Sequence, residues 1–133
     1  MIPAGTIAWA NCAPGFHPPS PHALIVVLVY PNKNLGVAFI THSSDLYRVG
    51  VRVVRADCPN AFREHGGPLT DENGILGLID SHGDSRVATA TALAPDRLRI
   101  GTSDVVLTRV VQLPDPQWQA LRVRIHVAQG TRQ

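Results

Sequence analysis

The amino-acid sequence predicts a mainly β fold: a small, strongly bent antiparallel barrel with a single C-terminal α-helix. Three observations lead to this prediction. Short apolar runs recur along the chain, turn residues separate them at regular intervals, and one clear helix start lies near the C-terminal end. Many short strands between regular turn signals are typical of small antiparallel barrels.

Length and composition favour one globular domain over residues 1–133. A chain of 133 residues with 44% hydrophobic and 17% charged residues can bury a core. No apolar run is long enough to cross a bilayer, and no basic segment precedes an apolar one, so we expect neither a membrane span nor a signal peptide. Cys12 and Cys58 are too few for a disulfide framework, which favours a cytoplasmic protein with reduced thiols.

The charge balance permits a nucleic-acid partner without requiring one. The net charge is only +2, but eleven of the twelve basic residues are arginines. Arginine favours forked contacts with phosphate or carboxylate groups. A GC-rich genome explains the same bias equally well.

The first predicted strand covers residues 6–11, where Ile7 and Trp9 share one face. Residues 12–21 follow as a loop. The loop contains four prolines, and each proline fixes its own φ and restricts the residue before it. A stiff loop of this kind can hold a side chain over a site.

A β-hairpin forms the centre of the predicted fold. Its two apolar runs, 24–30 and 35–41, are separated by turn residues at 31–34, and their length favours strands over helices. Continuous apolarity indicates that both faces of the strands are covered. Because the start of one antiparallel strand lies beside the end of the next, we expect His22 to lie near Thr41 and His42.

The rest of the chain alternates between short strands and turns. Predicted strands cover residues 49–56, 75–80, 86–93 and 105–111, with a fragment at 98–101. Residues 57–74 contain Pro and Gly breakers and are expected to form a long loop or insertion, which is uncommon in a compact domain unless it is functional or mobile.

The predicted helix covers residues 115–129. Asp115 is a suitable N-cap, and Pro116 suits the first helical position because it has no N–H to leave unpaired. One apolar face follows at spacings of three, four and three residues and consists of Trp118, Leu121, Ile125 and Ala128.

Four stretches occur in the order found in a known family. They are 5–9 (GTIAW), 21–27 (PHALIVV), 40–43 (ITHS) and 123–127 (VRIHV). In these features the sequence resembles the PemK/MazF family of toxins. The resemblance implies a dimeric SH3-like barrel that cuts single-stranded RNA and is held silent by an antitoxin peptide. It covers both ends of the chain and hardly touches residues 57–83.

The sequence also departs from the family pattern. His22 stands where the family usually has an arginine, whereas Thr41 matches the family's threonine. Thr89 and Thr91 stand where a later strand of the family often carries an Arg-x-Asp pair. The barrel pattern is therefore retained while the usual ribonuclease residues are only partly present.

Metal-independent RNA cleavage needs three kinds of group. A base removes the 2′-OH proton, an acid protonates the leaving 5′-oxygen, and cations or N–H donors stabilise the charge on phosphorus. Histidine titrates near neutrality and fills either proton-transfer role. The candidate catalytic residues are therefore His22, Thr41 and His42. The candidate substrate-binding residues are His17, Ser43, Arg48, Arg86, Thr89 and Thr91.

Other interpretations remain open from the residues alone. Polar residues at strand ends are solvated in most barrels, so a non-catalytic barrel that binds nucleic acid or a protein partner also fits. Three histidines together would suit zinc, but no Cys-x-x-Cys or His-Glu-x-x-His spacing occurs, so we expect no metal and no cofactor. The sequence favours a cytoplasmic toxin: a hydrolase acting on single-stranded RNA as a homodimer, with a cognate antitoxin and no membrane partner.

Overall fold

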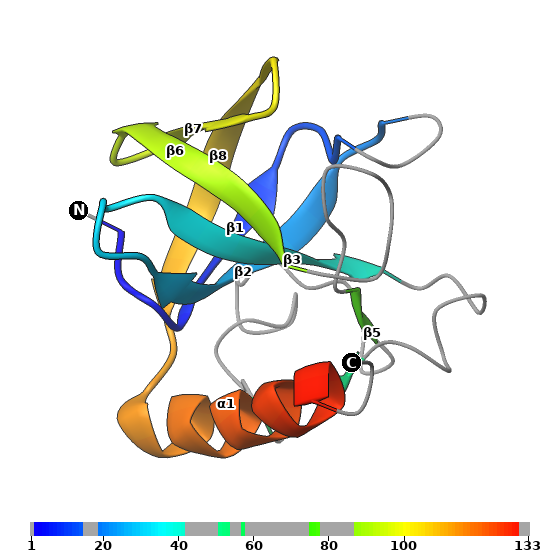
Figure 1. Cartoon of the computed structure of the whole chain (residues 1–133). Coiled ribbons are helices and arrows are strands. Elements are labelled where there is room, and N and C mark those ends of the chain that lie inside the picture. The colour runs from blue at the N-terminus through cyan, green and yellow to red at the C-terminus, as the bar shows by residue number, and fades with distance from the viewer. Residues whose placement is uncertain are drawn as a thin grey trace.

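The computed structural model describes residues 2–14, 19–41, 51–53, 57, 75–77 and 87–130. Within these ranges, short strands are followed by one C-terminal helix (Figure 1). The elements are β1 Thr6–Ala10, β2 His22–Val29, β3 Leu35–Thr41, β4 Val51–Arg52, β5 Ile75–Gly77, β6 Ala88–Ala94, β7 Arg97–Ile100, β8 Ser103–Gln112 and α1 Asp115–Gly130.

Strand pairing closes the sheet into a barrel. The strands follow the order β2-β1-β8-β7-β6-β3, and β2 also pairs with β3, which completes the ring. All these pairs are antiparallel. Closure leaves no unpaired edge among these strands, which is how small barrels avoid edge-to-edge association. The prediction of a mainly β fold, a small antiparallel barrel with a C-terminal helix, is therefore confirmed.

Strand β3 belongs to two pairings along its length. Its first part, from Leu35 to Val37, pairs with β6 and forms part of the barrel wall. Its last part, from Phe39 to Thr41, pairs instead with β5, and β5 pairs in turn with β4. The Thr41 end of β3 therefore leaves the barrel wall and continues into a short sheet extension.

Side chains of the β2–β3 hairpin alternate between two separate cores. Leu24, Val26 and Phe39 point into the barrel, where they join one buried apolar cluster. Ile25 and Ile40 belong to a second cluster that contains the buried face of α1. The prediction from continuous apolarity is confirmed, because both faces of the hairpin are covered.

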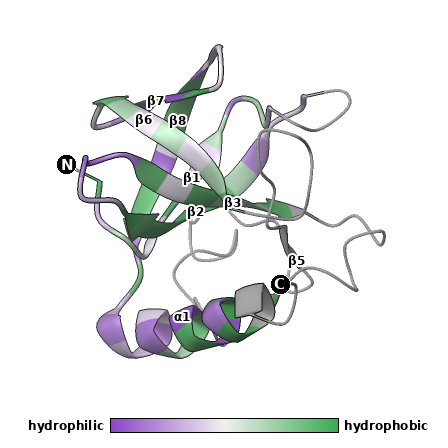
Figure 2. Cartoon of the chain, in the orientation of Figure 1, coloured by the Kyte–Doolittle hydropathy of each residue, from purple (hydrophilic) through white to green (hydrophobic). Residues whose placement is uncertain are grey.

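Helix α1 lies across the outer face of the hairpin and is buried along one side (Figure 1). Trp118, Leu121 and Ile125 are each at most 6% exposed, which confirms three positions of the predicted apolar face. Figure 2 shows apolar and polar residues interspersed along the helix. Among the described residues, no helix combines the length and apolar character needed to cross a membrane.

The start of α1 differs slightly from the prediction. The carbonyl of Pro114 accepts a hydrogen bond from Trp118 N at 3.0 Å, so Pro114 caps the helix and Asp115 lies in the first turn. Asp115 is therefore not the N-cap. Its negative charge interacts favourably with the positive N-terminal end of the helix dipole. The shift of one residue is within the usual uncertainty of helix ends.

The observed strands agree with the predicted ones to within a few residues. The largest extension is at β8, which covers Ser103–Gln112 instead of residues 105–111, and β2 begins at His22 instead of residue 24. The predicted strand at 49–56 is described only at residues 51–53, and that at 75–80 only at residues 75–77. The predicted loop 57–74 lies outside the described residues except for Asp57.

Trp118→Ala is expected to lower the free energy of unfolding by about 3–5 kcal/mol, because it opens a cavity between α1 and the hairpin. Urea denaturation measures the loss. Val110→Ala is the matched control, since Val110 is 49% exposed and its truncation should change stability by less than about 0.5 kcal/mol. A Trp118→Ala variant as stable as this control would contradict the account.

Gly5→Ala is expected to destabilise the protein more than Gly101→Ala. Both glycines have positive φ, +90° and +60°, so each substitution strains the backbone by about 1–2 kcal/mol. A Cβ at Gly5 would also lie 3.0 Å from Trp118 Cγ, whereas a Cβ at Gly101 would meet nothing within 4 Å. Urea denaturation measures both variants. An equal loss of unfolding free energy in the two would show that Trp118 does not pack closely against Gly5.

Candidate functional site

His22 lies at the start of β2 and is half-buried. Its Nδ1 lies 2.8 Å from the carbonyl oxygen of Ser20. Because a carbonyl oxygen only accepts, Nδ1 carries the proton, and the lone pair of the neutral ring is on Nε2. Pro21 favours an extended backbone at Ser20, which helps to set the direction of this carbonyl. The carbonyl of Ser20 therefore orients the ring of His22.

The end of β3 lies beside His22 in the backbone register. Ala23 and Ile40 form the last pair of the β2–β3 ladder, so His22 and Thr41 are the next residues beyond it, and His22 itself pairs with Ala10 of β1. On its other side, Thr41 pairs with Ile75 of β5. His22 and Thr41 therefore both lie one residue beyond the last β2–β3 pair, at the point where β3 leaves the barrel for β5.

Several predicted site residues lie outside the described part of the chain. These residues are His17, His42, Ser43, Arg48 and Arg86. For Thr41 the structure describes the backbone and not the side chain. Their assignment to the site stays a prediction from the sequence.

Thr89 and Thr91 lie on β6, which pairs with the other end of β3. Both are exposed on β6, and Thr89 pairs with Gly36 near the start of β3. Gly36 and Thr41 are about 16 Å apart along the strand, because a strand rises about 3.3 Å per residue. The structure therefore does not bring the two threonines to the end of the hairpin where His22 lies.

A polar surface that the sequence analysis missed surrounds Thr91. Across the outer face of the barrel, Thr91 pairs with Arg99 of β7, and Arg99 pairs with Asp104 of β8. Arg99 Nε lies 3.2 Å from Asp104 Oδ1, with both side chains more than half exposed. Arg97 is exposed on the same strand. The alternation of Arg97 and Arg99 with apolar residues was the signal that could have identified this surface.

Arg109 marks an irregularity in β8. The register of β8 on β1 shifts between Ile7 and Trp9, which leaves one extra residue on β8. Arg109 lies in this bulge and has a φ of 52°, in the left-handed region that most residues avoid. The bulge leaves Arg109 exposed on the surface of the barrel.

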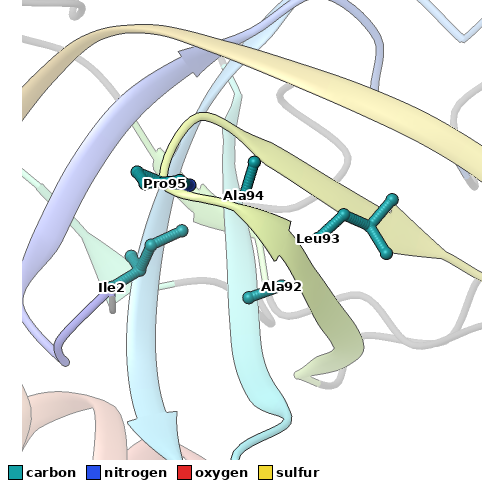
Figure 3. Close-up of a pocket in the computed structure, with 5 residues that line it drawn as sticks. All are labelled: Ile2, Ala92, Leu93, Ala94 and Pro95. Atoms are coloured by element: carbon teal, nitrogen blue, oxygen red, sulfur yellow. The ribbon is translucent and has the colours of Figure 1, made fainter.

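A shallow apolar hollow of about 220 Å³ lies at the edge of β6, lined by Ile2, Ala92, Leu93, Ala94 and Pro95. Figure 3 shows Ile2 pointing toward Ala94 and Pro95, whereas Leu93 points away. None of these side chains can donate a hydrogen bond or transfer a proton. The hollow therefore offers apolar contact and is not a site for phosphate chemistry.

Metal binding finds no support in the residues described. Within that part of the chain, no three His, Cys, Asp or Glu side chains gather closely enough to hold a metal ion. Cys12 is partly buried, and its sulfur lies 3.8 Å from the carbonyl oxygen of Asp104.

No protein family, curated protein or solved structure matches this chain in comparisons with known proteins. The resemblance to PemK/MazF toxins stays a prediction from the sequence motifs. The proposed function consequently depends on the fold and the residues described above.

Arg109→Gly is expected to leave the free energy of unfolding unchanged or slightly higher, because glycine adopts positive φ without strain. Arg109→Val should be less stable than Arg109→Gly by about 1–2 kcal/mol, since a β-branched residue is strained in this region. Urea denaturation of the two variants tests the bulge. Equal stabilities would mean that residue 109 does not have a left-handed backbone.

Proposed function

We propose that the protein is a PemK/MazF-like toxin with an SH3-like barrel, a metal-independent endoribonuclease that cleaves single-stranded RNA. It works in the cytoplasm as a homodimer and is silenced by a cognate antitoxin. The observation that carries the proposal is the end of the β2–β3 hairpin, where a histidine oriented by the Ser20 carbonyl and Thr41 both lie one residue beyond the Ala23–Ile40 pair.

The hydrogen bond to Ser20 gives His22 a defined chemical role. With Nδ1–H donating to the carbonyl oxygen, Nε2 carries the lone pair that accepts a proton. In the proposed reaction, Nε2 takes the proton from the ribose 2′-OH, and the resulting alkoxide attacks the adjacent phosphorus. The carbonyl stabilises the protonated ring, because the imidazolium still donates from Nδ1.

The remaining roles fall to the other residues that the sequence predicts for the site. His42 protonates the leaving 5′-oxygen, and the hydroxyl groups of Thr41 and Ser43 hydrogen-bond the phosphate. His17, Arg48 and Arg86 supply charge or hydrogen bonds to the RNA backbone. This step needs no metal because proton transfer and phosphate stabilisation both come from side chains.

A second candidate function is a non-catalytic barrel that binds nucleic acid or a protein partner. The separation of Thr89 and Thr91 from His22 favours it. The sequence resemblance places these threonines at the family's Arg-x-Asp positions. The exposed Arg97 and Arg99 on the outer face would then contact phosphate groups without cleaving them.

RNA cleavage in EDTA distinguishes the two functions. Wild-type protein should cut a long single-stranded RNA into discrete fragments, and His22→Ala should cut it about 10²–10⁴ times more slowly, the range for loss of general acid–base catalysis. His22→Asn keeps an amide N–H for Ser20 but cannot accept the proton, so it should be equally slow. Thr102→Ala, in the turn between β7 and β8, is the control with wild-type cleavage.

Two results would contradict the proposal. Wild-type rates in His22→Asn would remove His22 from the reaction. No cleavage by the wild-type protein, in EDTA or with added magnesium or zinc, would favour the binding barrel instead.

A further inference from the structure

Helix α1 has a second apolar stripe opposite its buried face. Pro116, Ala120, Val123 and Val127 are spaced four, three and four residues apart, so they lie on one side of the helix. All four are exposed. The buried residues Trp118, Leu121 and Ile125 lie about half a turn away from this stripe.

The two valines are the most exposed large apolar side chains in the described part of the chain. Val123 is 59% exposed and Val127 is 58% exposed. They are four residues apart and therefore adjacent on the helix surface. An apolar stripe with this spacing matches the narrow seam by which one helix packs on another.

The residues beside the stripe carry positive charge. Arg124 lies on one side of it and His126 on the other, and Arg122 lies beyond His126, next to the buried face. Arg124 pairs with Asp57 at 2.8 Å, while Arg122 is exposed with no ion pair among the described residues. Asp115, in the first turn, is the only acidic residue of α1.

We propose that the exposed face of α1 binds an acidic amphipathic helix of a partner protein. Such a helix places apolar residues on Val123 and Val127, with carboxylates near Arg124 on one side and near His126 and the more distant Arg122 on the other. A second copy of this chain fits less well, because it brings the same cations to the stripe and only Asp115 to meet them. The inference does not rest on RNA cleavage, since none of these residues belongs to the His22 site.

Two designed helical peptides test the proposal by fluorescence anisotropy with the full chain. Both carry leucines in a helical seam, one with glutamates beside the seam and the other with lysines. The glutamate peptide should bind more tightly than the lysine peptide, and added salt should weaken its binding. Arg122→Glu should reduce or reverse the preference between the peptides.

Two matched variants measure how much the apolar stripe, as distinct from the charges beside it, contributes to peptide binding. Val123→Ser/Val127→Ser should weaken binding of the glutamate peptide by more than about tenfold, because it removes the apolar contact. Val110→Ser changes an exposed valine on β8 and should bind like the wild type. Unchanged thermal midpoints show that both variants are folded.

Three outcomes would overturn the proposal. The glutamate peptide would bind no better than the lysine peptide, or the double serine variant would bind it as tightly as the wild type. Alternatively, sedimentation of the protein alone would show a dimer that the double serine variant abolishes, which would make a second copy the occupant.

Discussion

Two-sided burial of the β2–β3 hairpin is the constraint on which the rest of the fold depends. Val26 and Phe39 fill the barrel, while Ile25 and Ile40 meet α1 on the other face. Burying each large side chain contributes about 1.5–3 kcal/mol. A shift of one residue in register would exchange the two faces, so the packing fixes the pairing of β2 with β3.

The same register determines where chemistry is possible. Pairing of Ala23 with Ile40 brings the backbones of His22 and Thr41 to the end of the hairpin, where β3 leaves the barrel for β5. The core therefore holds the candidate site in place without contributing reactive groups to it. Thr89 is kept away from the site because it pairs with Gly36 at the opposite end of β3.

The sequence predicts the fold better than the site. Apolar runs and turn residues locate the hairpin, and the spacing of Trp118, Leu121 and Ile125 locates the buried face of α1, because both signals are local. The separation of Thr89 from His22 and the bulge at Arg109 arise from pairing between distant strands, which local patterns do not encode. The exposed stripe of α1 has smaller apolar side chains than the buried face, so the helical periodicity predicts only the buried face.

The most direct test of the proposed chemistry is mass spectrometry of RNA ends after incubation with the protein in EDTA. If His22 activates the ribose 2′-OH, the fragments carry 2′,3′-cyclic phosphates, and a 2′-deoxy nucleotide at the cleavage position prevents the reaction. Fragments with 3′-hydroxyl ends, or cleavage at the deoxy nucleotide, would contradict this account, because attack on phosphorus would then not come from the 2′-oxygen.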